Sequence, residues 1–170
     1  MNRIWKLLLA LTFMLPFVAI SQQAAAQETI VRFPNYYGKN VIVIRTAERK
    51  LYYTLGHGKA IQYPIAVGRD GMQRYGTTRV SYKRVNPEWR PTPRMRREDP
   101  KLPEVVPGGP GNPLGVRAMY LGWDLYRIHG TNNPSSIGKA ASSGCYRMYN
   151  SDVVKLYDRV KSGTKVVVEK

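Results

Sequence analysis

The chain has 170 residues and carries 27 lysines and arginines against 11 aspartates and glutamates, a formal net charge of +16. A hydrophobic content of 43% suits one domain with a core of its own. The single cysteine excludes an internal disulfide, and two histidines without metal-like spacing from it argue against a zinc site. We therefore expect no metal and no other cofactor, and the positive charge favours polyanionic partners.

The first 26 residues have the features of a secretory signal peptide. Arg3 and Lys6 supply a positive start, residues 7–20 form an apolar run, and three consecutive alanines end at Ala26. An uncleaved membrane anchor is the alternative, but the run is shorter than the roughly 20 apolar residues that a spanning helix needs. We expect cleavage after Ala26 and no membrane span afterwards.

Cleavage there leaves 170 − 26 = 144 residues with a charge of 25 − 11 = +14, because two basic residues are removed. We expect a signal peptide over 1–26, a short linker over 27–37 and one domain over 38–170. For an exported protein, acidic polymers of the cell envelope are better candidate partners than nucleic acid, since no nucleic-acid-binding module is recognisable. A basic surface without any single partner is the alternative.

The first half of the domain is expected to be β-structure. Residues 27–38 read as a linker or a first strand, and the β-branched run 40–45 is joined by a turn to 51–54, the pattern of a hairpin. Further strands are expected at 60–67, which ends at a glycine, and at 79–85, where polar and apolar residues alternate.

Residues 86–115 break this pattern with eight prolines and five arginines or lysines. Because proline lacks an amide donor and fixes φ, no sheet or long helix is expected in this segment. A loop of this length in a compact domain is either functional or disordered. We interpret it as a lid or wall of a substrate groove, with a mobile surface insertion as the alternative.

Strands are expected to return at 116–121, 125–129 and 164–168. A helix is expected over 152–160, where apolar residues recur at i, i+3, i+4 and i+7. Asn150 or Ser151 is its expected N-cap, and Gly163 its stop. These elements predict a mainly β domain, a sandwich or distorted barrel with one or two short helices and a long proline-rich lid loop.

Cys145 and His129 are candidates for a nucleophile and its base. A cysteine nucleophile needs a base, donors for the developing oxyanion and room for the substrate. Gly144 gives access, and its amide together with that of Cys145 can point at one oxygen. Ser142 can fix the loop, and Arg147 adds positive charge that can bind a carboxylate. The alternative is a buried, inert cysteine.

The other histidine, His57, lies between two glycines in a polar loop. Because such loops usually run over the surface, we interpret His57 as a surface residue rather than as a second base.

At the cysteine and histidine the chain resembles a known family. The sequence H-G-T at 129–131, followed by S-x-G-C-x-R-M at 142–148, is similar to the signature of the L,D-transpeptidases with a YkuD-type catalytic domain. The resemblance covers about residues 38–168. Two features depart from it: Tyr146 follows the cysteine where an aliphatic residue is usual, and residues 75–78 stand where a proline-containing turn is usual.

The resemblance implies a YkuD-like β-sandwich over 38–170 and an exported enzyme that acts on peptidoglycan. Cys145 would attack the bond between the third-position diamino acid and D-alanine of a tetrapeptide stem, and an amine would then receive the acyl group. His129 would be the proton donor and acceptor, oriented by the Gly130 carbonyl. The resemblance also implies oxyanion and support residues, Ser142, Ser143 and Gly144, and substrate-binding residues, Arg147, Thr131, Asn133 and Tyr120.

The acyl acceptor is left open by the sequence. It could be another stem, giving a 3–3 cross-link, an outer-membrane protein, a free D-amino acid, or water, which would make the protein an L,D-carboxypeptidase or hydrolase. A non-catalytic peptidoglycan-binding protein is the alternative outside enzymes. The expected partners are peptidoglycan stem peptides and not nucleic acid, and the expected compartment is the periplasm.

Overall fold

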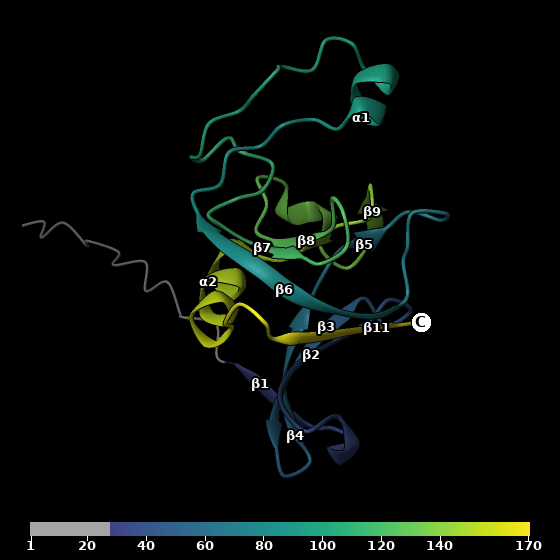
Figure 1. Cartoon of the computed structure of the whole chain (residues 1–170), viewed down its shortest axis with the longest axis vertical. Helices are drawn as coiled ribbons and strands as arrows, with labels where there is room; N and C mark the ends of the chain where they lie inside the picture. Colours follow the sequence, from purple (N-terminus) through teal and green to yellow (C-terminus); the bar gives the residue numbers. More distant parts are fainter. Residues whose placement is uncertain (1–27) are drawn as a thin grey trace, which may run out of the picture.

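The computed structural model describes residues 28–170, and the expected signal peptide lies outside them. The domain is long in one direction, with β1 and β4 at one end and a proline-rich loop at the other (Figure 1). The strands are β1 (Thr29–Arg32), β2 (Lys39–Arg45), β3 (Lys50–Gly56), β4 (Lys59–Pro64), β5 (Val67–Gly68), β6 (Gly76–Val85), β7 (Arg117–Leu121), β8 (Arg127–His129), β9 (Ala140–Ser142), β10 (Tyr146–Arg147) and β11 (Lys165–Glu169).

Nine of these strands form one sheet in the order β1-β4-β3-β2-β11-β6-β7-β8-β10, and β5 pairs with β9 in a second, small sheet. Strand β6 belongs to both halves of the large sheet. Its first residues pair with β11, from Gly76 opposite Val168 to Arg79 opposite Lys165. Its remaining residues pair with β7. The long diagonal strand in Figure 1 therefore carries the sheet from one half to the other.

The main core lies between the two halves of the sheet and the C-terminal helix. It contains fully buried residues of β2 such as Ile42 and Ile44, together with Met119 of β7 and Ile128 of β8. Because successive side chains of a strand point to opposite faces, Val41 and Val43 of β2 lie on the other side of the sheet, where they are also buried. The expectation of a mainly β, sandwich-like domain is confirmed, and so are the hairpin 40–54 and the strands around 60–67, 79–85 and 116–129.

Of the two expectations for the start of the domain, a linker over 27–37 or a first strand, the described residues show the strand. β1 pairs with β4 in antiparallel register, from Thr29 opposite Gln62 to Arg32 opposite Lys59. A 3-10 turn, Asn35–Tyr37, follows it. The physical reason is that Phe33 packs into a second apolar cluster on the outer face of the hairpin, with Tyr52 stacked on it at 4.6 Å between ring centroids. The segment is therefore part of the domain.

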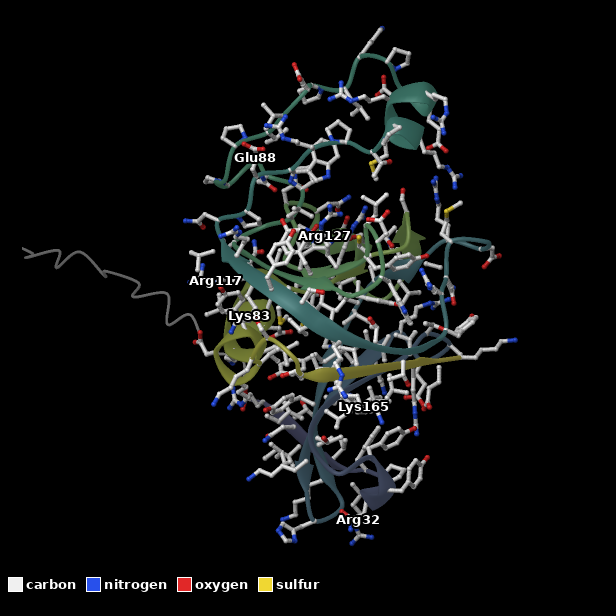
Figure 2. The ribbon with its side chains drawn as sticks, in the orientation of Figure 1. Arg32, Lys83, Glu88, Arg117, Arg127 and Lys165 are labelled. Carbon is white, nitrogen blue, oxygen red and sulfur yellow. The ribbon has the colours of Figure 1, made fainter. Side chains whose placement is uncertain are left out.

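The C-terminal helix α2 (Asn150–Arg159) packs Val153 and Leu156 into the core, as the apolar spacing predicted. Its end is held from β6, because Lys83 Nζ donates to the carbonyl oxygens of Tyr157 and Val160 at 2.5 Å each. Figure 2 shows Lys83 and Arg117 directed toward this helix. Within residues 28–170, no helix is long and apolar enough to cross a membrane.

The proline-rich segment 86–115, which we call the lid, is a loop with defined internal structure. It contains one short helix, α1 (Pro93–Glu98), capped by Thr92, whose Oγ1 accepts from the Met95 amide. A bridge between Trp89 and Val106 closes the loop on itself. In Figure 1 the lid lies over the end of the sheet that contains β7 and β8. The absence of a long helix or sheet from this part of the described chain follows from its prolines.

Asn112 ties the lid together from the inside. Its side chain is fully buried, and its Nδ2 lies 2.8–3.0 Å from three lid carbonyl oxygens. Its Oδ1 accepts from the Leu114 amide at 2.8 Å. Buried polar groups that lose their partners cost free energy. The conformation of the lid therefore depends on one amide side chain.

We expect Asn112→Ala to lower the free energy of unfolding by about 2–4 kcal/mol, because several buried backbone groups lose their partner at once. Urea unfolding measures the loss, and hydrogen exchange should show reduced protection over 86–115. The control is Asn132→Ala, which removes one exposed bond to the Gly111 carbonyl at 2.9 Å. Unchanged exchange in the lid of Asn112→Ala would contradict this role.

Candidate active site

The pairing of β8 with β10 brings the cysteine to the histidine. The two strands are parallel, with Tyr146 opposite Ile128 and Arg147 opposite His129. Tyr146 and Ile128 point into the core. Because side chains alternate across a strand, the residues beside them face the lid. The same register places Cys145 across from Arg127 on that face.

One cavity, of about 420 Å³, collects these side chains under the lid. Its floor includes Arg127, His129, Cys145 and Arg147 from β8 and β10. Its wall is the lid, which confirms the expectation that this loop borders a groove. The lid residues that line the cavity are Trp89, Arg90, Thr92, Pro93, Arg94, Met95, Arg97, Pro113 and Leu114.

His129 is buried, and its protonation state follows from its partners. Nδ1 lies 2.6 Å from the Gly130 carbonyl oxygen. A carbonyl only accepts, so Nδ1 carries the proton and Nε2 is the nitrogen that can accept one. Burial lowers the pKa of His129 to about 3, against the opposing effect of the Gly130 carbonyl. The imidazole is therefore neutral at neutral pH and able to act as a base.

Cys145 is half-buried and directly precedes β10. Its Sγ donates to the Leu125 carbonyl at 3.3 Å. Burial raises the pKa of the thiol, while the guanidinium groups of Arg127 and Arg147 oppose that shift. At rest the cavity thus holds a thiol and a neutral imidazole. The thiolate has to be generated by transfer of the proton to the base.

The turn that presents Cys145 is held by Ser142. Its hydroxyl donates to the Cys145 carbonyl at 2.5 Å and accepts from the Gly144 amide at 3.0 Å. Gly144 has φ +122°, and a Cβ there would press on the Met72 carbonyl and the Tyr126 ring at 3.1 Å. Only glycine suits this position.

The predicted oxyanion arrangement needs a correction at Gly144. Its amide is already used by the Ser142 hydroxyl, so it is not free to stabilise an oxyanion. The Cys145 amide has no hydrogen-bond partner among residues 28–170 and is the better candidate donor. Ser142 and Ser143 line the cavity, and Ser142 acts as the support that the sequence suggested.

Three expected substrate-binding residues lie elsewhere, while Arg147 lines the cavity. Thr131 is buried, and its hydroxyl accepts from the Asn133 amide at 3.0 Å, which shapes the loop after β8. Asn133 accepts from the Ser135 hydroxyl in the same loop. Tyr120 stacks on Tyr82 at 4.2 Å on the face of the sheet beside the cavity. All three make contacts within the protein and do not line the cavity, and their contact with substrate stays a prediction.

Arg127 is the cavity residue that sequence reasoning missed. Its guanidinium lies 5.1 Å from the centre of the Tyr120 ring and donates to the Leu125 carbonyl at 3.0 Å. Its Nε is buried without an acceptor, and no ion pair with a carboxylate is found for it within residues 28–170. Figure 2 shows Arg127 between the sheet and the lid. The signal in the sequence was its place two residues before His129 on one strand, which puts both on the same face.

We expect Arg127→Gln to raise the pKa of Cys145 further and to slow alkylation of the thiol by iodoacetamide at pH 7 by about tenfold, because a nearby positive charge favours the thiolate. The pH dependence of the alkylation rate measures this. Arg84→Gln is the matched control, since Arg84 lies over the Tyr82 ring at 5.6 Å in the same way but does not line the cavity. Equal rates in the two variants would contradict the prediction.

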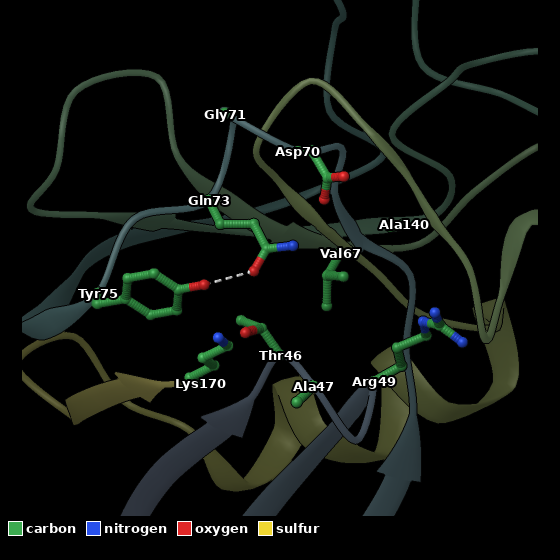
Figure 3. Close-up of a pocket in the computed structure, with 10 residues that line it drawn as sticks. All are labelled: Thr46, Ala47, Arg49, Val67, Asp70, Gly71, Gln73, Tyr75, Ala140 and Lys170. Carbon is green, nitrogen blue, oxygen red and sulfur yellow. Dashed lines mark hydrogen bonds between the residues drawn. The ribbon is translucent and has the colours of Figure 1, made fainter.

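The other large cavities carry neither the cysteine nor His129. The one in Figure 3, of about 440 Å³, lies between the β2–β3 turn and the loop after β5, where the Tyr75 hydroxyl donates to Gln73 at 2.8 Å. Another, of about 490 Å³, contains His57, which is exposed as expected for a loop residue. Residues 28–170 hold no group of three or more histidine, cysteine, aspartate or glutamate side chains placed to bind a metal.

Comparison with known proteins agrees with this geometry. The family model described as the L,D-transpeptidase catalytic domain, YkuD, matches residues 39–168. The chain is 42% identical over 134 residues to the "Probable L,D-transpeptidase ErfK/SrfK" of Escherichia coli (strain K12), a match that covers 75% of this chain and 43% of that protein.

Two solved structures show the same fold. An L,D-transpeptidase from Mycobacterium smegmatis is 18% identical, covers 76% of this chain and 58% of its own, and has a TM-score of 0.61. A Brucella melitensis protein described as a "Probable carnitine operon oxidoreductase caia" is 44% identical, covers 84% of this chain and 93% of its own, and has a TM-score of 0.57. That description differs from the names of the family and of the E. coli relative.

The fold and the cavity define a mainly β domain that places one thiol and one neutral imidazole under a lid. The chain belongs to the L,D-transpeptidase family, a family of cysteine-dependent enzymes, as its sequence motif predicted. It spans 43% of the length of the E. coli relative.

Proposed function

We propose that the protein is a peptidoglycan L,D-transpeptidase that works through a thioester on Cys145. The substrate is a tetrapeptide stem, and the bond that breaks joins its third residue, a diamino acid, to the terminal D-alanine. The product is the third residue joined to an amine. Export to the periplasm, through cleavage of the expected signal peptide, goes with this proposal.

In the first half of the reaction, Sγ of Cys145 attacks the carbonyl carbon of the third residue while Nε2 of His129 takes the thiol proton. The imidazolium then gives that proton to the departing amine of D-alanine, and the thioester remains. The Cys145 amide donates to the oxyanion that forms between these steps.

In the second half, an amine attacks the thioester carbonyl. His129 removes a proton from the amine and returns it to Sγ as the thioester breaks, which restores the resting pair. Water in place of the amine would release a tripeptide stem and make the protein an L,D-carboxypeptidase.

The proposal rests on the protonation states of His129 and Cys145, which line one cavity. Nδ1 of His129 is bound to the Gly130 carbonyl, so Nε2 is left to exchange the proton. Burial keeps the imidazole unprotonated at neutral pH. A neutral base and a thiol in one site are the resting components that general-base activation of a nucleophile requires.

The charge of the cavity supports an acidic peptide as substrate. Five arginines line it against one acid, Asp124. Arg127 and Arg147 have no carboxylate ion pair among residues 28–170, and burial lowers the pKa of Arg147. Stem peptides carry several carboxylates, which guanidinium groups bind through paired hydrogen bonds.

The experiment is product analysis with defined substrates. Purified protein is incubated with a tetrapeptide stem alone, and then with the stem plus a second stem, a free D-amino acid or a peptide with a C-terminal lysine. Release of D-alanine together with a joined product supports transpeptidation and identifies the acceptor. Release without joining in every mixture would replace the proposal by L,D-carboxypeptidase activity, and no release by folded protein would overturn it.

A further inference from the structure

The sequence suggested Asn150 or Ser151 as the N-cap of α2. Asn150 is instead the first residue of the helix, and its side chain does not cap it. The N-cap position is Tyr149, and it makes no side-chain cap bond. The Asn150 amide instead reaches the loop after β8. Oδ1 accepts from the Thr131 amide at 3.0 Å, and Nδ2 donates to the Thr131 carbonyl at 3.0 Å.

The first of these bonds acts on the peptide unit that also orients the histidine. The amide of Thr131 and the carbonyl of Gly130 belong to one planar, rigid group. That carbonyl accepts from Nδ1 of His129 at 2.6 Å. Fixing the N–H of this group therefore fixes the direction of its C=O, and with it the plane of the imidazole.

Two glycines make room for the asparagine. A Cβ on Gly130 would collide with Oδ1 of Asn150, and so would a Cβ on Gly115. Gly115 also has φ +65°, a conformation that favours glycine. The Asn150 side chain can therefore reach the loop after β8 only because residues 115 and 130 are both glycines.

We propose that Asn150 is a positioning residue that holds the imidazole of His129 in line with Cys145 through the Gly130–Thr131 peptide. The proposal rests on the proposed function in one respect, that His129 is the base for Cys145. It assigns to Asn150 no contact with substrate.

The test is the rate at which iodoacetamide alkylates Cys145 at pH 7, with the unfolding temperature of each variant measured beside it. Asn150→Ala is expected to slow alkylation by about tenfold, because a misplaced imidazole accepts the thiol proton less well. Asn132→Ala is the matched control, an asparagine of the same loop that bonds to the Gly111 carbonyl and is expected to change the rate less than about twofold.

Two further variants separate positioning from a general loss of structure. Asn150→Asp keeps an acceptor for the Thr131 amide, the bond that acts on the Gly130–Thr131 peptide, and loses only the donor to the Thr131 carbonyl. Its negative charge lies in the first turn of α2, where the helix dipole favours it. It is expected to recover most of the lost rate. In a His129→Gln background, Asn150→Ala is expected to cause no further loss, since residues that act through one group are not additive.

The proposal is overturned if Asn150→Ala reacts at the wild-type rate, if Asn150→Asp is no faster than Asn150→Ala at equal unfolding temperature, or if the loss persists in full in the His129→Gln background. Because the readout needs no peptide substrate, it gives a result even if the protein fails to transfer stems. Failure of the proposed function and failure of this inference are thus distinguishable.

Discussion

Cys145→Ala is expected to reduce release of D-alanine from a tetrapeptide stem by about 10⁴-fold or more, because it removes the only thiol and with it the covalent step. Ser142 cannot replace it, since its hydroxyl is bound to the Cys145 carbonyl and the Gly144 amide. The half-buried thiol donates to the Leu125 carbonyl and lies close to Arg127, and alanine removes only one sulfur atom, so the variant is expected to fold.

The measurement is D-alanine release by wild type and variant at equal concentration, with the unfolding temperature as a check on folding. Arg84→Gln serves as a control for preparation, since Arg84 does not line the cavity. Release by folded Cys145→Ala at more than a few per cent of the wild-type rate would place the chemistry on another group.

His129→Gln is expected to slow formation of the thioester by about 10²- to 10⁴-fold, the usual contribution of a general base. Glutamine keeps a polar side chain of similar length in this buried position, which limits the loss of stability. The pH dependence carries the sharper test. With the pKa of His129 lowered to about 3, the base form is present throughout the range from pH 5 to 8.

Thioester formation by the wild type is therefore expected to change little between pH 7 and pH 5. An imidazole with its ordinary pKa of about 6.5 would lose most of its base form over that interval, and the rate would fall with it. Single-turnover rates across this range, measured for wild type and His129→Gln, decide between the two. A rate that halves near pH 6.5 would contradict the neutral, buried imidazole.

Periodicity and motif spacing were enough to predict the strands and the two central residues. The β-branched run and the hairpin pattern locate β2 and β3, which are buried on both faces, alternation locates β6, and the H-G-T and S-x-G-C-x-R-M motifs point to His129 and Cys145. The sequence pattern did not distinguish β1 from a linker. β1 joins the sheet because Phe33 packs against Tyr52, which is a tertiary contact.

The cap assignment of Asn150 was wrong because the partner of its side chain lies far away in the chain. Asparagine is a residue type that often caps helices, but the Asn150 side chain hydrogen-bonds instead to the amide and the carbonyl of Thr131 in the loop after β8. Thr131 and Tyr120 make contacts within the protein, and contact with substrate stays a prediction for both. Arg127 lies two residues before His129 on β8 and so shares its face, but its place across from Cys145 depends on the register of β8 with β10.

The lid illustrates the same limit. Its eight prolines predict a loop without a long helix or sheet. They do not predict the buried Asn112 that ties it together, because the three carbonyls near its Nδ2 come from two distant parts of the loop, Pro87 on one side and Val106 and Pro107 on the other.

Formation of the acyl-enzyme on Cys145 is tested most directly by the intact mass of the wild-type protein after brief incubation with a tetrapeptide stem. The modified peptide is then mapped. We expect a mass increase equal to the stem minus D-alanine, located on Cys145 and absent from Cys145→Ala. Folded wild-type protein that acquires no such mass, or acquires it on another residue, would contradict the central claim that Cys145 forms the acyl-enzyme.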